Sequence, residues 1–217
     1  MKVELIGYFG NDLMSINAAR VSFGKEKETF DMNDAKLINY LVSHGHTSVF
    51  RHPQLQFRIK CPIYVERQLF KHQVGMSANS ISGRYVDFSD TYYKIDKWRK
   101  QSKNSKQGSD GLIDEQNIAS NIQHRVIEQC KGAYEYLLKL GVAKEQARSV
   151  LPLSLQTEFI WTGSLLAFIN LFKQRLKSDA QKETRIIVSK MLQCIKDIEG
   201  NPFKYSLIEF GLDEYEN

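Results

Sequence analysis

The sequence lacks any apolar run approaching the ~20 residues that a membrane-spanning helix needs. Its N-terminus, "MKVELIGYFGNDL", alternates polar and apolar residues and has none of the charged and apolar regions of a secretion signal. Cysteine is scarce too, since Cys61, Cys130 and Cys194 lie far apart and never form a CxxC pair. A disulfide framework is therefore improbable, and reduced thiols are typical of cytosolic proteins. We expect a soluble, cytoplasmic protein.

Two common phosphate-binding loops are also missing, because neither GxGxxG nor GxxxxGK[ST] occurs in the chain. The sequence shows no internal repeat either, which argues against a solenoid or propeller. What it does have is 217 residues with 42% hydrophobic and 11% aromatic content. This is enough for one sizeable core, so we expect residues 1–217 to form a single compact domain.

Positive charge is in slight excess, with a formal net charge of +5. Much of the excess lies in "KIDKWRKQSKNSKQGSDG", residues 94–111, where apolar periodicity vanishes. We expect a solvated, basic surface loop here. A nucleic-acid-binding module is the alternative, but it would gain support from interleaved aromatic rings, and Trp98 is the only ring in the most basic part.

Strand-like patterns fall mostly in the first half of the chain. Leu55, Phe57 and Ile59 alternate with polar neighbours in "QLQFRIK", and residues 85–93 are β-prone and aromatic. A helix is predicted over "DMNDAKLINYLVSHG", beginning at Asn33 or Asp34 and ending at Gly45.

Helical patterns dominate the second half. Apolar residues recur at helical spacing from Ile118 to Gly141, and further helices are predicted over residues 144–150, 160–176 and 178–200. Early antiparallel strands with helices, followed by a helix-rich C-terminal half, indicate an α+β fold and not a doubly wound parallel sheet.

The most unusual segment is "KHQVGMSANSISGRY", residues 71–85, which is rich in groups that bind ligands. The preceding segment "CPIYVERQLFKHQ" reads as a helix with Pro62 in its first turn. Gln68, Lys71 and His72 share one face of that helix. The segment therefore either holds an anion or forms an ordinary polar loop.

Two arginines stand beside apolar residues, Arg148 in "ARSVLPLSL" and Arg175 in "LFKQRLKSDAQ". Each could simply lay its aliphatic stem over the core, as surface arginines usually do. Together with Lys71 and Arg84 they could instead form a clamp for phosphate and carbonyl groups. Spacing alone does not show whether they converge.

Metal and thiol chemistry have weaker support. His44, His46, His52 and His72 could share a cation, but no Cys, Asp or Glu stands near them at a recognised ligand spacing, so we expect no metal. No cysteine stands beside an activating motif, although sequence distance leaves a cysteine nucleophile open.

Five blocks in a fixed order carry a family resemblance, over about Asn11 to Phe210. They are "HGHTSVFRH", "ERQLFKHQVGMSANSISGRYVDF", "ARSVLPLSL", "WTGSLLAFINLF" and "RLKSDAQKE". Read together, they resemble the flavin-dependent thymidylate synthases.

This resemblance implies a homotetrameric methyltransferase that converts dUMP to dTMP. It would take a one-carbon unit from methylenetetrahydrofolate and reducing equivalents from NADPH through FAD, without the cysteine nucleophile of the ordinary thymidylate synthases. An enzyme of the same fold acting on another pyrimidine nucleotide is the nearest alternative.

The resemblance also implies site residues by position. Arg175 would be catalytic, acting on N3 and O4 of the uracil ring. The dUMP site would comprise Gln68, Lys71, Ser80, Ser82, Gly83, Arg84, Arg148 and Arg175. The FAD site would comprise His46, Ser48, Lys71, His72, Gln73, Ser80, Ser164, Leu165, Leu166 and Asn170.

The chain departs from the family's signature at three of these positions. The signature has Arg-His-Arg where this chain has Lys71, His72 and Gln73, and it commonly has Glu where this chain has Ser80. Lys71 keeps the positive charge without the forked donors of arginine, Gln73 loses the charge, and Ser80 lacks the carboxylate.

Overall fold

The computed structural model describes residues 1–86, 91–103 and 108–215. Its elements in chain order are β1 (Lys2–Phe9), α1 (Asp12–Arg20), η1 (Val21–Phe23), α2 (Met32–Ser43), η2 (Thr47–Arg51), β2 (Gln54–Pro62), α3 (Ile63–Leu69), β3 (Met76–Ser80), β4 (Arg99–Gln101), β5 (Ser109–Leu112), α4 (Gln116–Lys139), α5 (Lys144–Ala147), η3 (Arg148–Val150), β6 (Gln156–Ser164), α6 (Leu165–Arg175), α7 (Lys182–Lys196) and α8 (Lys204–Glu209).

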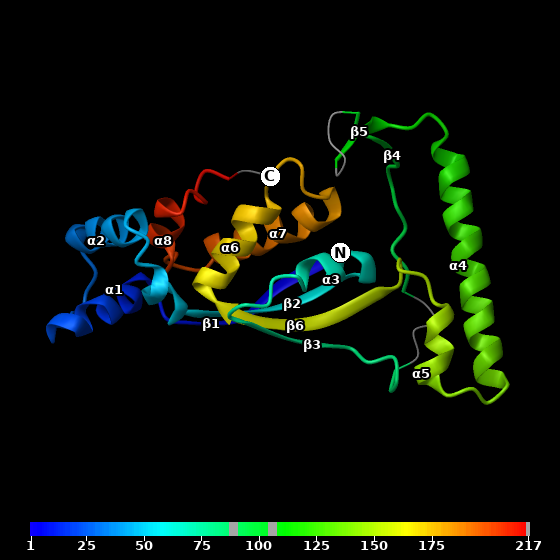
Figure 1. The fold of residues 1–217 in the computed structure, drawn as a ribbon, viewed down its shortest axis with the longest axis horizontal. Helices are drawn as coiled ribbons and strands as arrows, with labels where there is room; N and C mark the ends of the chain where they lie inside the picture. Colours follow the sequence, from blue (N-terminus) through cyan, green and yellow to red (C-terminus); the bar gives the residue numbers. More distant parts are fainter. Residues whose placement is uncertain (87–90, 104–107, 216–217) are drawn as a thin grey trace.

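The main sheet is antiparallel, with strand order β1-β2-β6-β3, and β4 and β5 form a separate two-stranded sheet. Helices α3, α6 and α7 lie over one face of the main sheet (Figure 1). The side chains of β2 and β6 alternate between more and less buried, because one face of each strand packs on these helices. The fold is the expected α+β class.

The two central strands lead directly into helices. β2 ends at Pro62, whose extended backbone caps α3, and β6 ends at Ser164, whose Oγ accepts a hydrogen bond from Ala167 N at 3.2 Å as the N-cap of α6. Since β2 and β6 are antiparallel, α3 and α6 begin at opposite ends of the strand pair.

Aromatic rings join these elements into one core. Phe57 on β2 lies 5.1 Å from Phe168 on α6 in an edge-to-face arrangement, and Trp161 on β6 lies 5.6 Å from the same ring. Phe159 on β6 contacts Phe70, the residue after α3, with ring centroids 4.9 Å apart. Edge-to-face pairs stabilise by about 1 kcal/mol beyond burial, so they fix α3 and α6 against the sheet.

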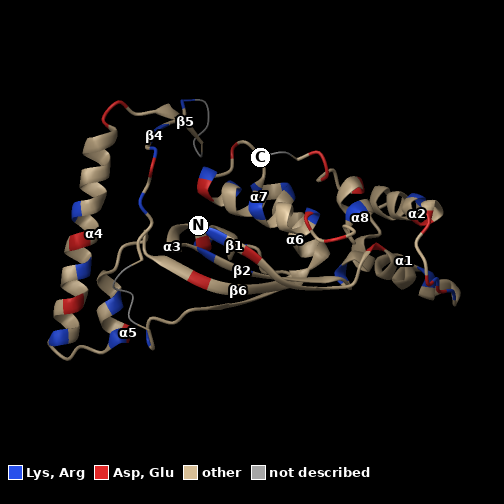
Figure 2. Ribbon diagram, turned by 180° about the vertical axis from the view of Figure 1, so that it is seen from behind, with Lys and Arg blue, Asp and Glu red and all other residues tan. Residues whose placement is uncertain are grey.

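Helix α4 stands apart from the sheet and carries acidic and basic residues interspersed along its length (Figure 2). Only Ile127 and Tyr134 are buried in it. Helix α4 anchors the basic segment, residues 94–111, through two hydrogen bonds. Trp98 Nε1 donates to Ser120 Oγ at 3.0 Å, and Gln123 Oε1 accepts from Ile95 N at 3.0 Å. The described part of residues 94–111 is thus a surface segment, but one that contains strands and is held by hydrogen bonds.

Several expected elements are confirmed: the strand over residues 54–60 is β2, and the helix running to Gly141 is α4. The helix α2 begins earlier than expected, because Asp31 and not Asn33 or Asp34 caps it, in a capping box with Asp34. Of the β-prone residues 85–93, those at 87–90 lie outside the described residues, and Tyr92 forms an isolated bridge with Leu155.

Three expectations about elements are wrong. Residues 160–164 belong to β6, so the helix predicted over 160–176 begins only at Leu165. Residues 76–80, for which an ordinary polar loop was the alternative to a ligand-binding run, form the strand β3 and not a loop. Helix α3 ends at Leu69, so Lys71 and His72 lie beyond it and do not share its face with Gln68.

Within the described ranges, no helix has both the length and the apolar content needed to cross a membrane.

A buried ionic cluster stabilises the α1–α2 region and generates a pH prediction. Asp34 is fully buried, accepts from Lys27 Nζ and Asp31 N at 2.8 Å each, and pairs with Arg20. Burial acts to raise the pKa of Asp34, but the hydrogen bonds from Lys27 and Arg20 outweigh it and lower this pKa to about 2. The carboxylate therefore stabilises the fold at pH values above its unfolded pKa of 3.8, and this contribution is lost as the pH falls towards 2.

We expect Asp34→Asn to lower the free energy of unfolding by about 2 kcal/mol at pH 7. The difference from wild type should shrink as the pH falls from 4 towards 2, measured by urea unfolding. Glu28→Gln, at an exposed position nearby, is the control and should change little. If the difference in free energy of unfolding between Asp34→Asn and wild type does not vary with pH, the Asp34 carboxylate is not ionised and stabilising as described.

Candidate active site

Three of the expected site residues meet between α3 and the end of α6. Arg175 Nε donates to His72 Nε2 at 3.0 Å, and an Arg175 terminal nitrogen donates to the backbone oxygen of Gln68 at 3.4 Å. In the part of the chain that the structure describes, no carboxylate forms an ion pair with Arg175. The protein thus orients the guanidinium of Arg175, while its positive charge has no described carboxylate partner and its remaining donors can bind a ligand.

His72 is neutral in this arrangement. Its Nε2 accepts the hydrogen bond from Arg175, which places the proton on Nδ1. Burial lowers the pKa of His72, and the neighbouring Arg175 charge lowers it further. A neutral imidazole beside an arginine leaves a net positive charge, which suits an anionic or carbonyl-rich ligand.

A chain of side chains extends from Gln68 towards α7. Thr184 Oγ1 donates to Gln68 Oε1 at 2.9 Å, and Gln68 Nε2 donates to Gln181. Gln181 donates to the buried Glu183, which also pairs with Arg99 at 2.7 Å. Burial acts to raise the pKa of Glu183, but the Arg99 hydrogen bond outweighs it and lowers the pKa, so the pair stays ionised.

Gln68, Gln181, Glu183 and Arg99 border a cleft of about 900 Å³. Arg175 and Gln68 line one side of the cleft, and the turn before α7 lines another. Strands β4 and β5 of the basic segment line the third side. The basic segment is therefore part of the cleft wall, which its sequence did not predict.

A second group of expected residues lines a different cavity, of about 290 Å³. Ser80, Gly83 and Arg148 border it, together with Glu66 from α3. Ser80 Oγ donates to Glu66 Oε1 at 2.8 Å. Glu66 thus supplies a carboxylate beside Ser80, the position at which the signature of the resembled family has Glu.

None of the described residues lines both cavities, so the expected dUMP residues form two separate groups. Gln68 and Glu66, on the short helix α3, face different cavities. In Figure 1 the end of α6 lies with α7 above the sheet, whereas α5, which leads into Arg148, lies beyond one end of the sheet beside α4. Lys71, Ser82 and Arg84 border neither cavity, and Arg84 stacks its guanidinium 5.3 Å from the centroid of the Tyr85 ring.

The loop after α3 packs against the start of α6. Ser164 N donates to Gly75 O at 3.1 Å. Gly75 has φ +75°, which favours glycine, and a Cβ on Gly163 would lie 3.0 Å from Gly75 O. This close approach brings the expected FAD residues His72 and Ser164 into one region.

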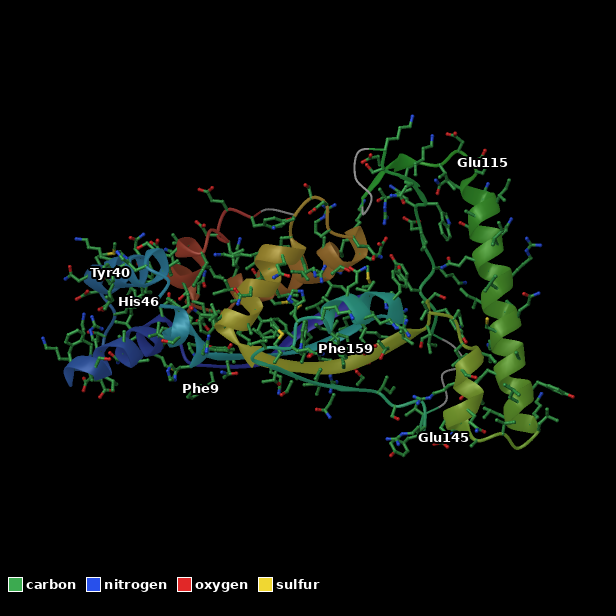
Figure 3. The ribbon with its side chains drawn as sticks, in the orientation of Figure 1. Phe9, Tyr40, His46, Glu115, Glu145 and Phe159 are labelled. Carbon is green, nitrogen blue, oxygen red and sulfur yellow. The ribbon has the colours of Figure 1, made fainter. Side chains whose placement is uncertain are left out.

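The other expected FAD residues are more dispersed. Ser48 is exposed on η2, which packs against α6, and Asn170 is exposed on α6. His46 lies beside Tyr40 at the α2 end of the molecule, whereas Glu145, the residue whose carbonyl binds Arg148, lies at the opposite end (Figure 3). Leu165 and Leu166 are buried at the start of α6, and Leu165 N donates to Pro53 O at 2.9 Å.

Thiol and metal chemistry gain no support from the geometry. All three cysteines are free, and burial raises the pKa of the Cys61 thiol to about 12, which leaves it unreactive at neutral pH. Among the described residues, no three His, Cys, Asp or Glu side chains cluster as a metal site would require.

Sequence reasoning missed Thr184, Gln181, Glu183, Arg99 and Glu66. The first four reach the site through contacts between residues far apart in the chain, and spacing carries no signal for such contacts. The contact from Thr184 to Gln68, for example, joins residues separated by 116 positions. Glu66, in contrast, opens the block "ERQLFKHQVGMSANSISGRYVDF" and lies only 14 positions before its partner Ser80.

Comparisons with known proteins identify the class to which this fold and site belong. The family model described as "Thymidylate synthase complementing protein" matches residues 4–199. A flavin-dependent thymidylate synthase of Thermus thermophilus is 41% identical over 196 residues, which cover 90% of this chain and 71% of that protein. One from Kosmotoga olearia is 42% identical over 183 residues, covering 83% and 79%. The chain therefore belongs to the flavin-dependent thymidylate synthase family.

Solved structures support the same family. The chain is similar to a UMP/dUMP methylase, PolB, from Streptomyces cacaoi in a crystal structure bound with 5-Br dUMP, with a TM-score of 0.86 and 27% identity over 97% of this chain and 94% of that one. The same methylase bound with 5-Br UMP gives a TM-score of 0.84.

The donor set of the expected cofactor residues fits a flavin dinucleotide. Lys71, Gln73, His46 and Asn170 are exposed and offer hydrogen-bond donors, and the expected FAD set contains no Asp or Glu. Such donors suit a diphosphate, and the carboxylate that a described hydrogen bond joins to this set is Glu66, through Ser80.

We predict that the pKa of the His72 imidazole lies below its usual value of 6.5. Histidine-ring NMR over pH 4–9 measures this, with His72→Gln to assign the signal. Arg175→Ala should move the midpoint upwards, because a neighbouring positive charge is removed. Arg185→Ala, which removes a guanidinium bound to Ser178 O, should leave it unchanged. A wild-type midpoint at or above 6.5 would contradict the arrangement.

Proposed function

We propose that this protein converts dUMP to dTMP by reductive methylation. Methylenetetrahydrofolate would donate the one-carbon unit, and NADPH would reduce the bound FAD. The observation that carries the proposal is Arg175, which His72 and Gln68 hold at the edge of a cleft without a carboxylate partner. Family membership supplies the reaction class.

Arg175 suits activation of a uracil ring. Its free guanidinium donors can bind the O4 carbonyl, and would stabilise negative charge that develops on O4 and N3 during methylation. The neutral His72 holds Nε of Arg175 through a hydrogen bond without competing for its charge. When bound, FAD supplies the hydride that completes the new methyl group.

The complete nucleotide site would require a second copy of the chain. Arg175 and Gln68 line one cavity, and Ser80, Gly83 and Arg148 line the other, so one chain does not place all the expected dUMP ligands together. In a symmetric oligomer, the second group of one copy can face the first group of its neighbour. We therefore propose a homotetramer with sites shared between subunits.

Exposed apolar surface supports this assembly. Along α4, Ile118 is 60% exposed, Tyr136 63% and Leu140 62%. On the N-terminal part, Phe9 is 62% and Phe23 79% exposed. Such large apolar side chains are typical of surfaces that subunit contacts cover.

A pyrimidine ribonucleotide is the second candidate substrate. It is favoured by the similarity to the methylase bound with 5-Br UMP. Nucleic-acid binding by the basic segment has less support, because Arg99 is paired with Glu183 and Trp98 with Ser120. The free thiols are typical of the cytosol, where we place the protein.

We predict that Arg175→Ala lowers the methylation rate by about 100-fold or more, because a group that stabilises transition-state charge is lost. The variant should still retain FAD after gel filtration, and its flavin should still bleach with NADPH under anaerobic conditions. Mass spectrometry of the products from dUMP, UMP and dCMP measures the rate and identifies the substrate.

Lys177→Ala, at an exposed basic position just beyond α6, is the matched control and should be fully active. An Arg175→Ala enzyme that methylates dUMP at the wild-type rate would refute the assigned role. A wild-type protein that retains no FAD even with dUMP would refute the proposed function.

A further inference from the structure

Glu66 is a carboxylate in the smaller cavity to which neither the sequence nor the family resemblance assigned a role. It lies on α3 and accepts hydrogen bonds from the hydroxyls of Ser80, at 2.8 Å, and Thr157. It shares the cavity with Gly83 and Arg148. The described wall also includes apolar side chains, among them Ile63, Phe70 and Leu155.

The carboxylate has capacity for a further donor. An ionised carboxylate offers about four acceptor positions, and the two hydroxyls use two of them. Burial raises the pKa of Glu66 despite these hydrogen bonds. A donor supplied by a ligand would therefore stabilise its ionised form.

The chemistry of the proposed substrate limits which group can be that donor. The phosphate of dUMP is an anion that the carboxylate would repel and that Arg148 attracts. Of the two neutral donors on dUMP, N3–H belongs to the edge bound by Arg175. The remaining donor is the ribose 3′-hydroxyl, and UMP adds only the 2′-hydroxyl.

We propose that Glu66, oriented by Ser80 and Thr157, accepts a hydrogen bond from a ribose hydroxyl of the substrate and so positions its sugar. This inference rests on the proposed function, since it assumes a pyrimidine nucleotide in the shared site. Arg148, in the same cavity, has only a backbone acceptor, Glu145 O at 3.3 Å, among its described hydrogen bonds, so it remains available for the phosphate. The cavity thus holds an acceptor for the sugar and a cation for the phosphate.

The test pairs a change in the protein with a matched change in the ligand. Calorimetry on the flavin-loaded protein measures the Kd of dUMP and of 2′,3′-dideoxyUMP, which lacks the 3′-hydroxyl. Wild type should bind dUMP roughly ten-fold more tightly than the dideoxy analogue, because the analogue cannot form the charge-assisted hydrogen bond with Glu66. Glu66→Ala should bind both ligands about equally, since the hydroxyl no longer has its acceptor.

Two further variants complete the design. Glu66→Gln keeps the shape of the side chain and removes its charge, so its preference for dUMP should fall to a few-fold even if Glu66→Ala does not fold. Glu158→Ala removes an exposed carboxylate that pairs with Arg58 at 3.7 Å, and should keep the full preference.

The outcomes separate this inference from the proposed function. If Glu66→Ala and Glu66→Gln keep the wild-type preference in a protein that methylates dUMP, the sugar contact is refuted and the function stands. A wild-type preference near unity would also refute the contact. A wild-type protein that binds neither ligand would refute the proposed function itself.

Discussion

The antiparallel pairing of β2 with β6 is the constraint on which the site depends. The two strands pair from Gln54 opposite Ser164 to Pro62 opposite Gln156, and each leads directly into a helix at its end. The helices α3 and α6 therefore start from opposite ends of one strand pair and pack on the same face of the sheet (Figure 1). Edge-to-face contacts of Phe57 and Trp161 with Phe168 hold α6 in place, and as a result the end of α6 reaches the residues that follow α3.

The same arrangement explains why the residues that we propose for nucleotide binding fall into two half-sites in one chain. Because α3 lies between the cleft of Arg175 and the cavity of Arg148, its Gln68 serves the first and its Glu66 the second. A nucleotide carries both a phosphate and an imide edge, and the two half-sites offer complementary chemistry for them. In the homotetramer that we propose, association of copies would bring the two half-sites together.

Sequence patterns predicted part of this. Period-two alternation at Leu55, Phe57 and Ile59 identified β2, and the order of motifs identified the family before any geometry was known. The boundary between β6 and α6 was missed because apolar residues stand on both sides of it. The short interruption by Thr162, Gly163 and Ser164, of which Ser164 is the N-cap of α6, was read as part of the helix. β3 was missed because Ser, Ala and Asn have low strand propensity. The contact from Arg175 to His72 spans 103 positions, so no local pattern could have predicted it.

The most direct test of the shared site is complementation between two inactive variants. Arg175→Ala and Arg148→Ala proteins, each measured alone, should methylate dUMP far more slowly than wild type. Refolded together at equal amounts, they should recover about a quarter of wild-type activity, because random assortment gives one site in about four both native arginines. Recovery near this level would establish that Arg175 and Arg148 of different subunits form one site. A mixture no more active than the separate variants would contradict the account.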